Sequence, residues 1–230
     1  MDGIINLNKP RGISSARAVS MIKRVLSRGV KVGHAGTLDP FATGVLLILV
    51  GKSTKSCENL MSQPKGYRAV IKLGATTATF DPESAEIPAV DPVVPDRAAV
   101  EAALRQMVGV ISQRPPIFSA LKIAGQEAYK LARAGKEVKL EPRLVTIYSI
   151  ELLNYDWPFV TVQVECGRGT YIRAIARDLG EALGTGGYLT ELSRTHVGEF
   201  DLAQAHTIEE VRNLGPESCL THFPGVAERD

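Results

Sequence analysis

The longest apolar run in the chain, Val45–Val50, directly follows a glycine-rich segment, Gly33–Gly44. Six residues cover about a third of a membrane span, so the run predicts a buried strand and not a transmembrane helix. A chain of 230 residues is long enough to bury a core in one large domain or two small ones. The pattern therefore indicates a soluble globular protein in which a permissive loop leads into a core strand.

Strand and helix patterns along the rest of the chain predict an α+β fold with a mixed, mainly antiparallel sheet and flanking helices. Besides the central run, we expect strands at 3–7, 67–73, 145–153, 159–166 and 188–200. We expect helices at 53–61, 98–108, 126–134, 171–183 and 208–214, the last capped by Thr207, and one that starts at Ser14 or Ser15 and ends at Gly29. Residues 81–96 have the proline content of a surface connector. Residues 111–145 form a basic excursion from the domain.

The cysteines and histidines give no sign of a disulfide framework or a metal site. The chain has three cysteines, which are widely spaced and outside CxxC motifs, and its histidines have no ligand spacing. The N-terminus has neither the basic region nor the long apolar region of a signal peptide. We therefore expect a cytoplasmic protein that binds no metal.

Charge is distributed unevenly although the net charge is only +2. Residues 1–80 carry a balance of +9, whereas residues 146–230 carry −7. A basic half opposite an acidic half is typical of a face that binds a polyanion such as nucleic acid. The same lysines and arginines could equally serve to solvate helix surfaces.

Asp39 is the one acidic residue of the Gly33–Gly44 segment, which also lacks lysine and arginine. Three glycines in the segment allow unusual backbone geometry and close approach of another molecule. Pro40 pushes Asp39 toward an extended conformation. The carboxylate is therefore either a group that closes a turn or a reactive group.

Arg173 stands out by its position at the start of a predicted helix. If Thr170 is the N-cap of the helix at 171–183, Arg173 occupies the third helical position, where the macrodipole disfavours a cation. A carboxylate partner would offset this cost, and Asp39 and Asp178 are both candidates. The alternative is an arginine that is simply exposed to solvent. Pairing with Asp39 would keep that carboxylate ionised and suited to act as a nucleophile or base.

Tyr67 lies between Lys65 and Arg68 in a predicted strand. An aromatic ring flanked by cations can stack on a nucleobase while the cations meet phosphates. A strand tyrosine can also be buried for packing alone. His34, in the Asp39 segment, is either structural or catalytic.

Six motifs in order give the chain a resemblance to one family. They are Gly3–Ser15, Gly33–Gly44, Lys65–Arg68, Pro116–Lys122, Gly169–Arg173 and Leu189–Arg194. Together they resemble the bacterial tRNA pseudouridine synthases of the TruB type, which modify uridine 55 in the T loop. The resemblance extends from residue 3 to about residue 214, and that many motifs in the same order are highly specific.

The resemblance implies a pseudouridine synthase fold and the isomerisation of uridine to pseudouridine in the T stem-loop of tRNA. This reaction needs no cofactor. By the same resemblance Asp39 is the nucleophile, Arg173 is its ion-pair partner, and Tyr67 stacks on the flipped base and helps to remove the C5 proton.

Further roles follow from the resemblance. Leu192 would pack in the base pocket, and His34 would fill the space that the flipped nucleotide leaves. Lys9 and Lys65 would meet the RNA backbone. The excursion at 111–145 corresponds to a thumb insertion that grips the stem-loop.

The resemblance also shapes the expected domain organisation. We expect a catalytic domain at 1–214 and a short tail at 215–230, without the C-terminal RNA-binding PUA module that many relatives carry. The relatives that depend on guide RNA rely on that module and on partner proteins, so we expect a monomer with no obligate protein partner. The alternative hypothesis is an RNA-binding or tRNA-folding factor whose catalysis is incidental. A hydrolase that uses Asp39 would need a second carboxylate, and none has a recognisable spacing.

Overall fold

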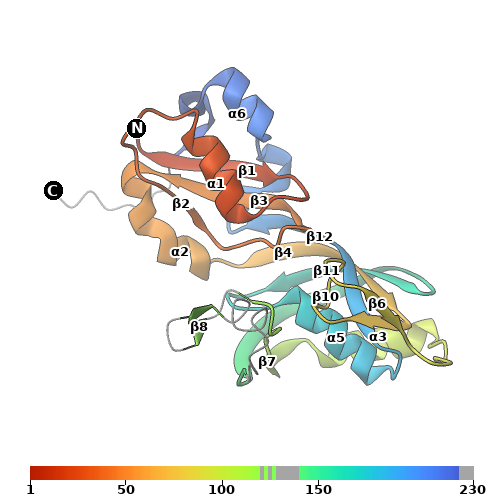
Figure 1. Ribbon diagram of the computed structural model, residues 1–230. Coiled ribbons are helices and arrows are strands. Elements are labelled where there is room, and N and C mark those ends of the chain that lie inside the picture. The colour runs from red at the N-terminus through yellow and green to blue at the C-terminus, as the bar shows by residue number, and fades with distance from the viewer. Residues whose placement is uncertain (120–121, 124–125, 128–139, 223–230) are drawn as a thin grey trace. The chain divides into compact units, whose positions relative to one another are not determined.

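The computed structural model describes residues 1–119, 122–123, 126–127 and 140–222, which divide into two compact units (Figure 1). Unit 1 contains residues 1–68 and the chain from Leu192 onward, and unit 2 contains residues 69–191. Two strands, β4 (Lys65–Leu73) and β12 (Gly187–Val197), belong in part to each unit. In the described residues, no helix has both the length and the apolar character that crossing a bilayer requires.

Unit 1 is built on β3 (Thr43–Val50), which is the apolar run seen in the sequence. β3 pairs antiparallel with β1 (Gly3–Lys9) and β2 (Val32–Ala35), and its first residues pair parallel with β12. The strand order in this unit is β14-β1-β3-β12-β4, and β13 (Phe200–Asp201) pairs with β12. All residues from Gly44 to Val50 are buried, which explains the absence of polar alternation.

The outer edge of β1 is covered by two short pieces of chain. β14 (Leu220–Thr221) pairs with Ile4 and Ile5. Farther along the strand, His206 forms a bridge with Leu7, accepts a hydrogen bond from the Asn8 N–H and donates one to the Asn6 carbonyl. Residues 220–221, which the sequence places in a tail, are thus part of the sheet.

Short helices flank the sheet of unit 1. They are α1 (Ser15–Lys23), the 3₁₀ turn η1 (Gly51–Ser56), α2 (Cys57–Ser62), η2 (Leu202–Gln204), α6 (Ile208–Leu214) and η3 (Pro216–Cys219). Thr207 caps α6 as predicted, and Glu210 completes a capping box that was not predicted. The Thr207 hydroxyl accepts from the Glu210 N–H while the Glu210 carboxylate accepts from the Thr207 N–H.

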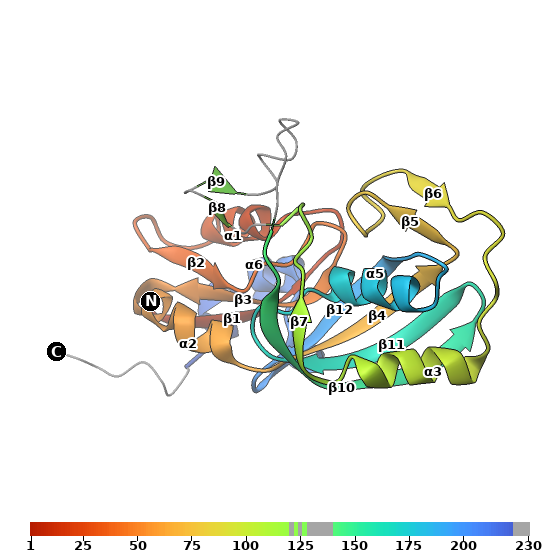
Figure 2. The same cartoon turned by 90° about the horizontal axis from the view of Figure 1, so that it is seen from below.

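The described residues of unit 2 form a second group of strands with helices beside them (Figure 2). The strand order is β12-β4-β11-β10-β7, with β7 at Gly109–Gln113, β10 at Arg143–Asp156 and β11 at Phe159–Cys166. Two separate hairpins pair β5 (Ala75–Thr77) with β6 (Glu86–Pro88) and β8 (Lys122–Ile123) with β9 (Gln126–Glu127). α3 (Arg97–Gln106) packs on α5 (Ile172–Ala182) and on β10.

The α+β class and the mixed, mainly antiparallel strand pairing are confirmed. β11 has the predicted bounds, and its alternation is as expected, because Val160, Val162, Val164 and Cys166 are buried while the residues between them are partly exposed.

Several predicted boundaries are wrong. The first helix ends at Lys23 and not near Gly29, because the Val25 N–H bonds to the Ile22 carbonyl and tightens the last turn. β2 was not predicted, since its four residues include a glycine and a histidine. The helix predicted at 126–134 lies outside the described residues, except that Gln126–Glu127 form β9.

Two glycines with positive φ offer a matched test of the close approach between β3 and β12. Gly44 has a φ of +100°, and a Cβ there would collide with the backbone carbonyl of Arg194, whereas Gly29 has a φ of +86° and nothing within 4 Å. We expect Gly29→Ala to lower the free energy of unfolding by about 1–2 kcal/mol, the cost of the left-handed backbone alone. Gly44→Ala should cost about 3 kcal/mol or more, since the steric clash adds to that cost. Urea unfolding followed by circular dichroism measures both, and equal losses would contradict the predicted clash.

Candidate nucleic-acid site

The Asp39 loop joins β2 to β3 in unit 1. Leu38 and Phe41 are buried on either side of Asp39, which is itself partly exposed. The Ala42 N–H bonds to the Asp39 carbonyl at 3.1 Å, so the backbone itself closes the turn. This backbone hydrogen bond does not use the Asp39 carboxylate.

Ser15, the first residue of α1, holds the residue before Asp39. Its buried hydroxyl accepts a hydrogen bond from the Leu38 N–H at 2.8 Å and donates one to the Leu38 carbonyl at 3.0 Å. One side chain thus satisfies both backbone groups of a buried residue, which would otherwise cost free energy. The start of the helix fixes the position of the loop.

Lys9 lies at the end of β1 and is fully buried. Its ammonium donates to the carbonyls of Pro10 and Ile13, both at 2.8 Å, and to that of Pro40 at 3.4 Å. The prediction that Lys9 contacts the RNA backbone does not fit this geometry, because the ammonium lies in the interior. Its observed contacts stabilise the backbone on the other side of Asp39.

Arg194, on β12, holds the two ends of the same loop. Its buried guanidinium donates to the Val45 carbonyl at 2.7 Å and to the Gly36 carbonyl at 2.9 Å. Gly36 has a φ of +79°, and a Cβ there would lie 3.4 Å from Nη1 of Arg194. The sequence assigned Arg194 no role, although its place at the end of the Leu189–Arg194 motif, two residues after Leu192, was a signal.

His34 lies on β2 and not in a loop as predicted. Its Nδ1 is buried and has no hydrogen-bond partner within the part of the chain that the structure describes. Burial, and secondly the positive charge of Arg194, lower the pKa of His34. The imidazole is therefore neutral near pH 7.

The remaining predicted residues of unit 1 lie on β4 and β12. Tyr67 and Leu192 are both buried, and the Leu192 carbonyl accepts from the Thr43 hydroxyl at 3.5 Å. Lys65 is buried too, with its ammonium bonded to the carbonyls of Met61 and Gln63 at 2.8 and 2.7 Å. Like Lys9, it is therefore placed to stabilise protein backbone and not to contact RNA phosphates.

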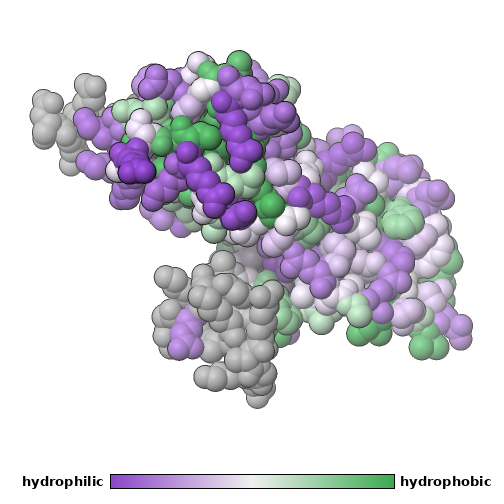
Figure 3. All heavy atoms as spheres, turned by 45° about the horizontal axis from the view of Figure 1, so that its top comes forward, coloured by the Kyte–Doolittle hydropathy of each residue, from purple (hydrophilic) through white to green (hydrophobic). Residues whose placement is uncertain are grey.

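Six exposed cations of unit 1 lie on and around α1. They are Arg11, Arg17, Lys23, Arg24, Arg28 and Lys31, and further exposed cations of the unit lie elsewhere. Hydrophilic side chains cover much of the face of this unit that Figure 3 shows. The basic character predicted for residues 1–80 is thus carried by exposed side chains, which suits contact with a polyanion.

In unit 2, Arg173 lies in the first turn of α5. The N-cap is Tyr171 and not Thr170, whose hydroxyl bonds to the Gly167 carbonyl at 3.1 Å, so Arg173 is the second helical residue and not the third. The position is still one at which the helix dipole disfavours a cation. A compensating partner is therefore expected, as before.

Asp81 is such a partner, and the sequence analysis missed it. Nη1 of Arg173 lies 3.0 Å from Oδ2 of Asp81, and both side chains are buried. The predicted surface connector at 81–96 is therefore wrong at its first residue, although most of its other residues are exposed. Asp178, the alternative partner, instead pairs with Arg177.

Arg173 also donates to two carbonyls, that of Thr79 at 3.1 Å and that of Phe118 at 2.8 Å. It thereby ties the turn at 77–81 to the start of the predicted thumb. Among the described residues, no cluster of three or more His, Cys, Asp or Glu side chains could hold a metal ion.

Comparison with known proteins identifies matching families and relatives. A family model described as "TruB family pseudouridylate synthase (N terminal domain)" matches residues 23–172, and one described as "tRNA pseudouridylate synthase B C-terminal domain" matches residues 173–218. tRNA pseudouridine synthase B of Pseudomonas fluorescens (strain Pf0-1) is 46% identical over 217 residues, which cover 94% of this chain and 70% of that protein. The protein of the same name from Parabacteroides distasonis is 46% identical over 90% of this chain and 91% of its own length.

A solved structure has the same fold. A chain in the crystal structure of a Cbf5-Nop10-Gar1 complex superposes with a TM-score of 0.71 and 30% sequence identity. The match covers 92% of this chain and 54% of that chain, so this chain spans about half of the solved one.

Removal of the Ser15 hydroxyl should destabilise the protein. Ser15→Ala leaves the Leu38 N–H and carbonyl unpaired, and we expect the free energy of unfolding to fall by about 1–3 kcal/mol. Ser20→Ala is the matched control, because the Ser20 hydroxyl is exposed on the same helix and bonds only to the Ala16 carbonyl; it should stay within about 0.5 kcal/mol of wild type. Equal effects in urea unfolding would contradict the role given to Ser15.

The pKa of His34 should lie below the ordinary histidine value of 6.5, because the side chain is buried near Arg194. The lowered pKa means that the folded protein favours neutral His34. The contribution of neutral His34 to the free energy of unfolding is therefore complete above pH 6.5, and it is lost as the pH falls from 6.5 toward the pKa of His34 in the folded protein. Imidazole NMR signals measure this pKa directly. The difference in unfolding free energy between wild type and His34→Gln should shrink over the same pH range. A difference that does not change with pH would contradict the predicted pKa shift of His34.

Proposed function

Because the chain belongs to the TruB family of pseudouridylate synthases and is a tRNA pseudouridine synthase, we propose that its target is uridine 55 in the T loop of tRNA and that Asp39 is its nucleophile. The observation that carries the assignment of Asp39 is the support of its loop. Buried side chains of Ser15 and Lys9 hold the backbone of the residues directly before and after Asp39.

Such support is what a nucleophile requires. A catalytic carboxylate must be held close to the productive geometry, and a free loop would not do this. The partial exposure of Asp39 leaves it accessible, while its buried neighbours Leu38 and Phe41 limit its contact with water.

The proposed reaction is an isomerisation without cofactor or metal. The target nucleotide leaves its stack, since the reacting atoms are inaccessible in folded RNA. The Asp39 carboxylate then attacks the uridine, the glycosidic bond breaks, and the base rejoins the ribose through C5. The bond to Asp39 breaks as C5 joins C1′. The C5 proton is then lost while N1, released from the ribose, takes up a proton, so that the atoms of the product are those of the substrate.

The other residues around the base receive their roles from the family resemblance. Tyr67 would stack on the flipped uracil and help to remove the C5 proton, and Leu192 would pack beside it. Their positions on β4 and β12, with side chains largely buried, support a rigid base pocket. His34, held neutral, would fill the space left in the RNA without adding charge.

Arg173 would be the ion-pair partner that keeps Asp39 ionised, an assignment that rests on the family resemblance. Its ion pair with Asp81 and its bonds to two carbonyls support such a role, because they fix the guanidinium in place. A fixed cation is a better electrostatic partner than a mobile one.

The grip on RNA is best assigned to the exposed cations around α1 and to the thumb insertion at 111–145. This replaces the contacts first expected from Lys9 and Lys65, whose ammonium groups are buried. We further propose that the enzyme works in the cytoplasm as a monomer without an obligate protein partner.

Asp39→Asn tests the nucleophile. An amide attacks and leaves poorly, so we expect conversion of uridine in a T-loop stem-loop to fall by at least about 10³-fold while RNA binding persists. Asp156→Asn, an exposed residue of unit 2, is the control and should convert at the wild-type rate.

Pseudouridine is measured by mass spectrometry of the digested RNA. Conversion by Asp39→Ala would refute the residue assignment. Binding by wild type without conversion would favour the alternative, an RNA-binding or tRNA-folding factor.

Tyr67→Phe tests the proton-transfer role. The ring and its stacking are kept while the hydroxyl is lost, so we expect unchanged RNA affinity and a turnover lower by about 10²-fold. Single-turnover kinetics at saturating enzyme separate the two quantities. Unchanged turnover would remove the hydroxyl from the mechanism and leave Tyr67 a stacking residue.

A further inference from the structure

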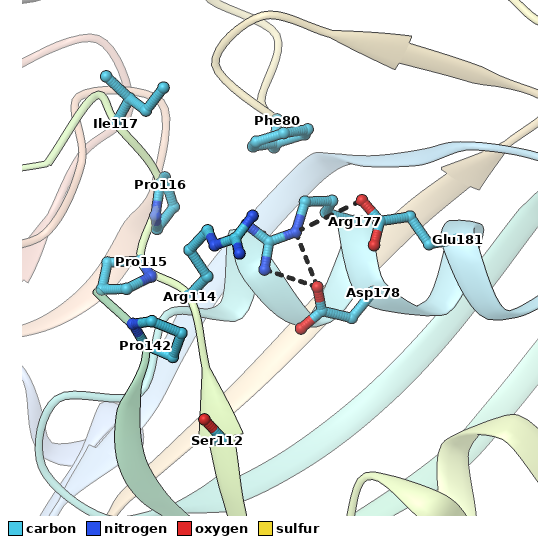
Figure 4. Close-up of a pocket in the computed structure, with 10 residues that line it drawn as sticks. All are labelled: Phe80, Ser112, Arg114, Pro115, Pro116, Ile117, Pro142, Arg177, Asp178 and Glu181. Atoms are coloured by element: carbon cyan, nitrogen blue, oxygen red, sulfur yellow. Dashed lines mark hydrogen bonds and ion pairs between the residues drawn. The ribbon is translucent and has the colours of Figure 1, made fainter. Parts of the chain in front are cut away.

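Unit 2 contains a pocket of about 540 Å³ beside α5 (Figure 4). One wall comes from α5 itself, another from the segment that follows β7, and Phe80 lies across from them. The volume is in the range of sites for small ligands, about 300–1,000 Å³. The pocket lies within one unit, and every residue that lines it is described.

Arg177 stacks over one face of the Phe80 ring in this pocket, which leaves the other face of the ring for a ligand. The guanidinium carbon of Arg177 lies 5.5 Å from the centre of the Phe80 ring. Asp178 holds the same guanidinium, with Oδ1 at 2.7 Å from Nε and 2.6 Å from Nη2. The planar groups are therefore fixed before any ligand arrives, which reduces the entropy cost of binding.

Arg114 also lines the pocket, with its side chain pointing toward Arg177 (Figure 4), and differs from Arg177 in being exposed. Within the described residues its guanidinium has no hydrogen bond, although its charge acts on Asp178. An arginine with unused donors beside a pocket is suited to bind a phosphate in a bidentate manner.

The remaining lining combines apolar and acceptor groups. Pro115 and Pro116 are buried prolines whose rings form an apolar wall. Asp178 and Glu181 both pair with Arg177 through one carboxylate oxygen, and the second oxygen of each remains as an acceptor for a ligand. Burial raises the pKa of Asp178 against the opposing effect of Arg177. With two arginines and two acids the pocket is neutral on balance, so it does not fit a ligand that is only anionic.

A nucleotide matches this combination. Its phosphate would face Arg114, its base would stack on Phe80 and the proline wall, and the N–H groups of the base would bond to the carboxylates. Bases with several donors on one edge, such as guanine, would use the carboxylates best.

The pocket shares its supports with Arg173. Arg177 is four residues after Arg173 on α5, which places the two on the same face about 6 Å apart along the helix. Phe80 lies between Thr79 and Asp81, and Arg173 bonds to both of these neighbours. The pocket residue Ile117 is followed by Phe118, whose carbonyl also accepts a hydrogen bond from Arg173. A nucleotide in this pocket would therefore lie close to the arginine assigned to the reaction.

We propose that the pocket holds a second, unpaired nucleotide of the substrate RNA, with its phosphate on Arg114 and its base on Phe80. The proposal rests on the proposed function in so far as RNA is the substrate. It adds a recognition site outside the residues that the resemblance assigns.

The phosphate contact is tested by Arg114→Ala, with Arg105→Ala as control, because Arg105 is an exposed arginine of the same unit outside the pocket. We expect Arg114→Ala to weaken binding of a T-loop stem-loop about fivefold or more. The slope of log Kd against log salt should fall by about 0.7, the value for one contact to single-stranded RNA. Arg105→Ala should leave both unchanged. If the two variants bind alike at every salt concentration, the proposal is overturned.

The base contact is tested with RNAs in which one loop nucleotide at a time is abasic. In wild type, one position other than the target should weaken binding about tenfold, as expected for the loss of one stacked base. For the Phe80→Leu variant, the same abasic position should weaken RNA binding by less than about threefold, because the aromatic ring on which the base stacks is already absent. Equal losses in both proteins at every position would contradict the site. Circular dichroism confirms that the variants are folded.

The results separate this site from the proposed function. Binding that depends on Arg114, without conversion of uridine by wild type, would support the pocket and refute the function. Conversion with the same KM in wild type and Arg114→Ala would support the function and refute the pocket.

Discussion

The burial of two positive charges beneath the Asp39 loop is the constraint on which the candidate site depends. Lys9 and Arg194 both lie in the interior of unit 1, where an ammonium or guanidinium group is costly unless its N–H groups are bonded. The carbonyls that bond to them include those of Gly36, Pro40 and Val45. Any large movement of the loop would remove hydrogen bonds from a buried cation. The free-energy cost of this loss fixes the conformation of the Asp39 loop.

Features that depend on neighbours in sequence were predictable. The central strand β3, the alternation of β11 and the Thr207 N-cap follow from hydrophobic period and local hydrogen bonding, and the structure has all three. Boundaries were less predictable. The end of α1 depends on one tightened turn, and β2 has too few residues to show a period.

Features that depend on distant partners were not predictable from one sequence. Arg173 was recognised as needing a carboxylate, but Asp81 lies 92 residues away in a proline-rich stretch that looks exposed. The family resemblance assigns Lys9 and Lys65 to RNA contacts, and nothing in the local sequence shows that carbonyls converge on their ammonium groups. Arg194 went unnoticed for the same reason. Burial of a polar side chain is decided by tertiary packing, which also creates the pocket beside α5.

The cover on the outer edge of β1 has a consequence for how this protein behaves in solution. An uncovered strand edge offers unpaired N–H and carbonyl groups to any other extended chain and so promotes aggregation. Here Leu220 and Thr221 occupy one end of the edge, and His206 bonds to the backbone farther along. Two short segments, neither of them part of the candidate site, thus protect the strand that carries Lys9 from pairing with another molecule. The residues that cover this edge therefore oppose aggregation, and they also hold β1, the strand whose Lys9 bonds to the Asp39 loop.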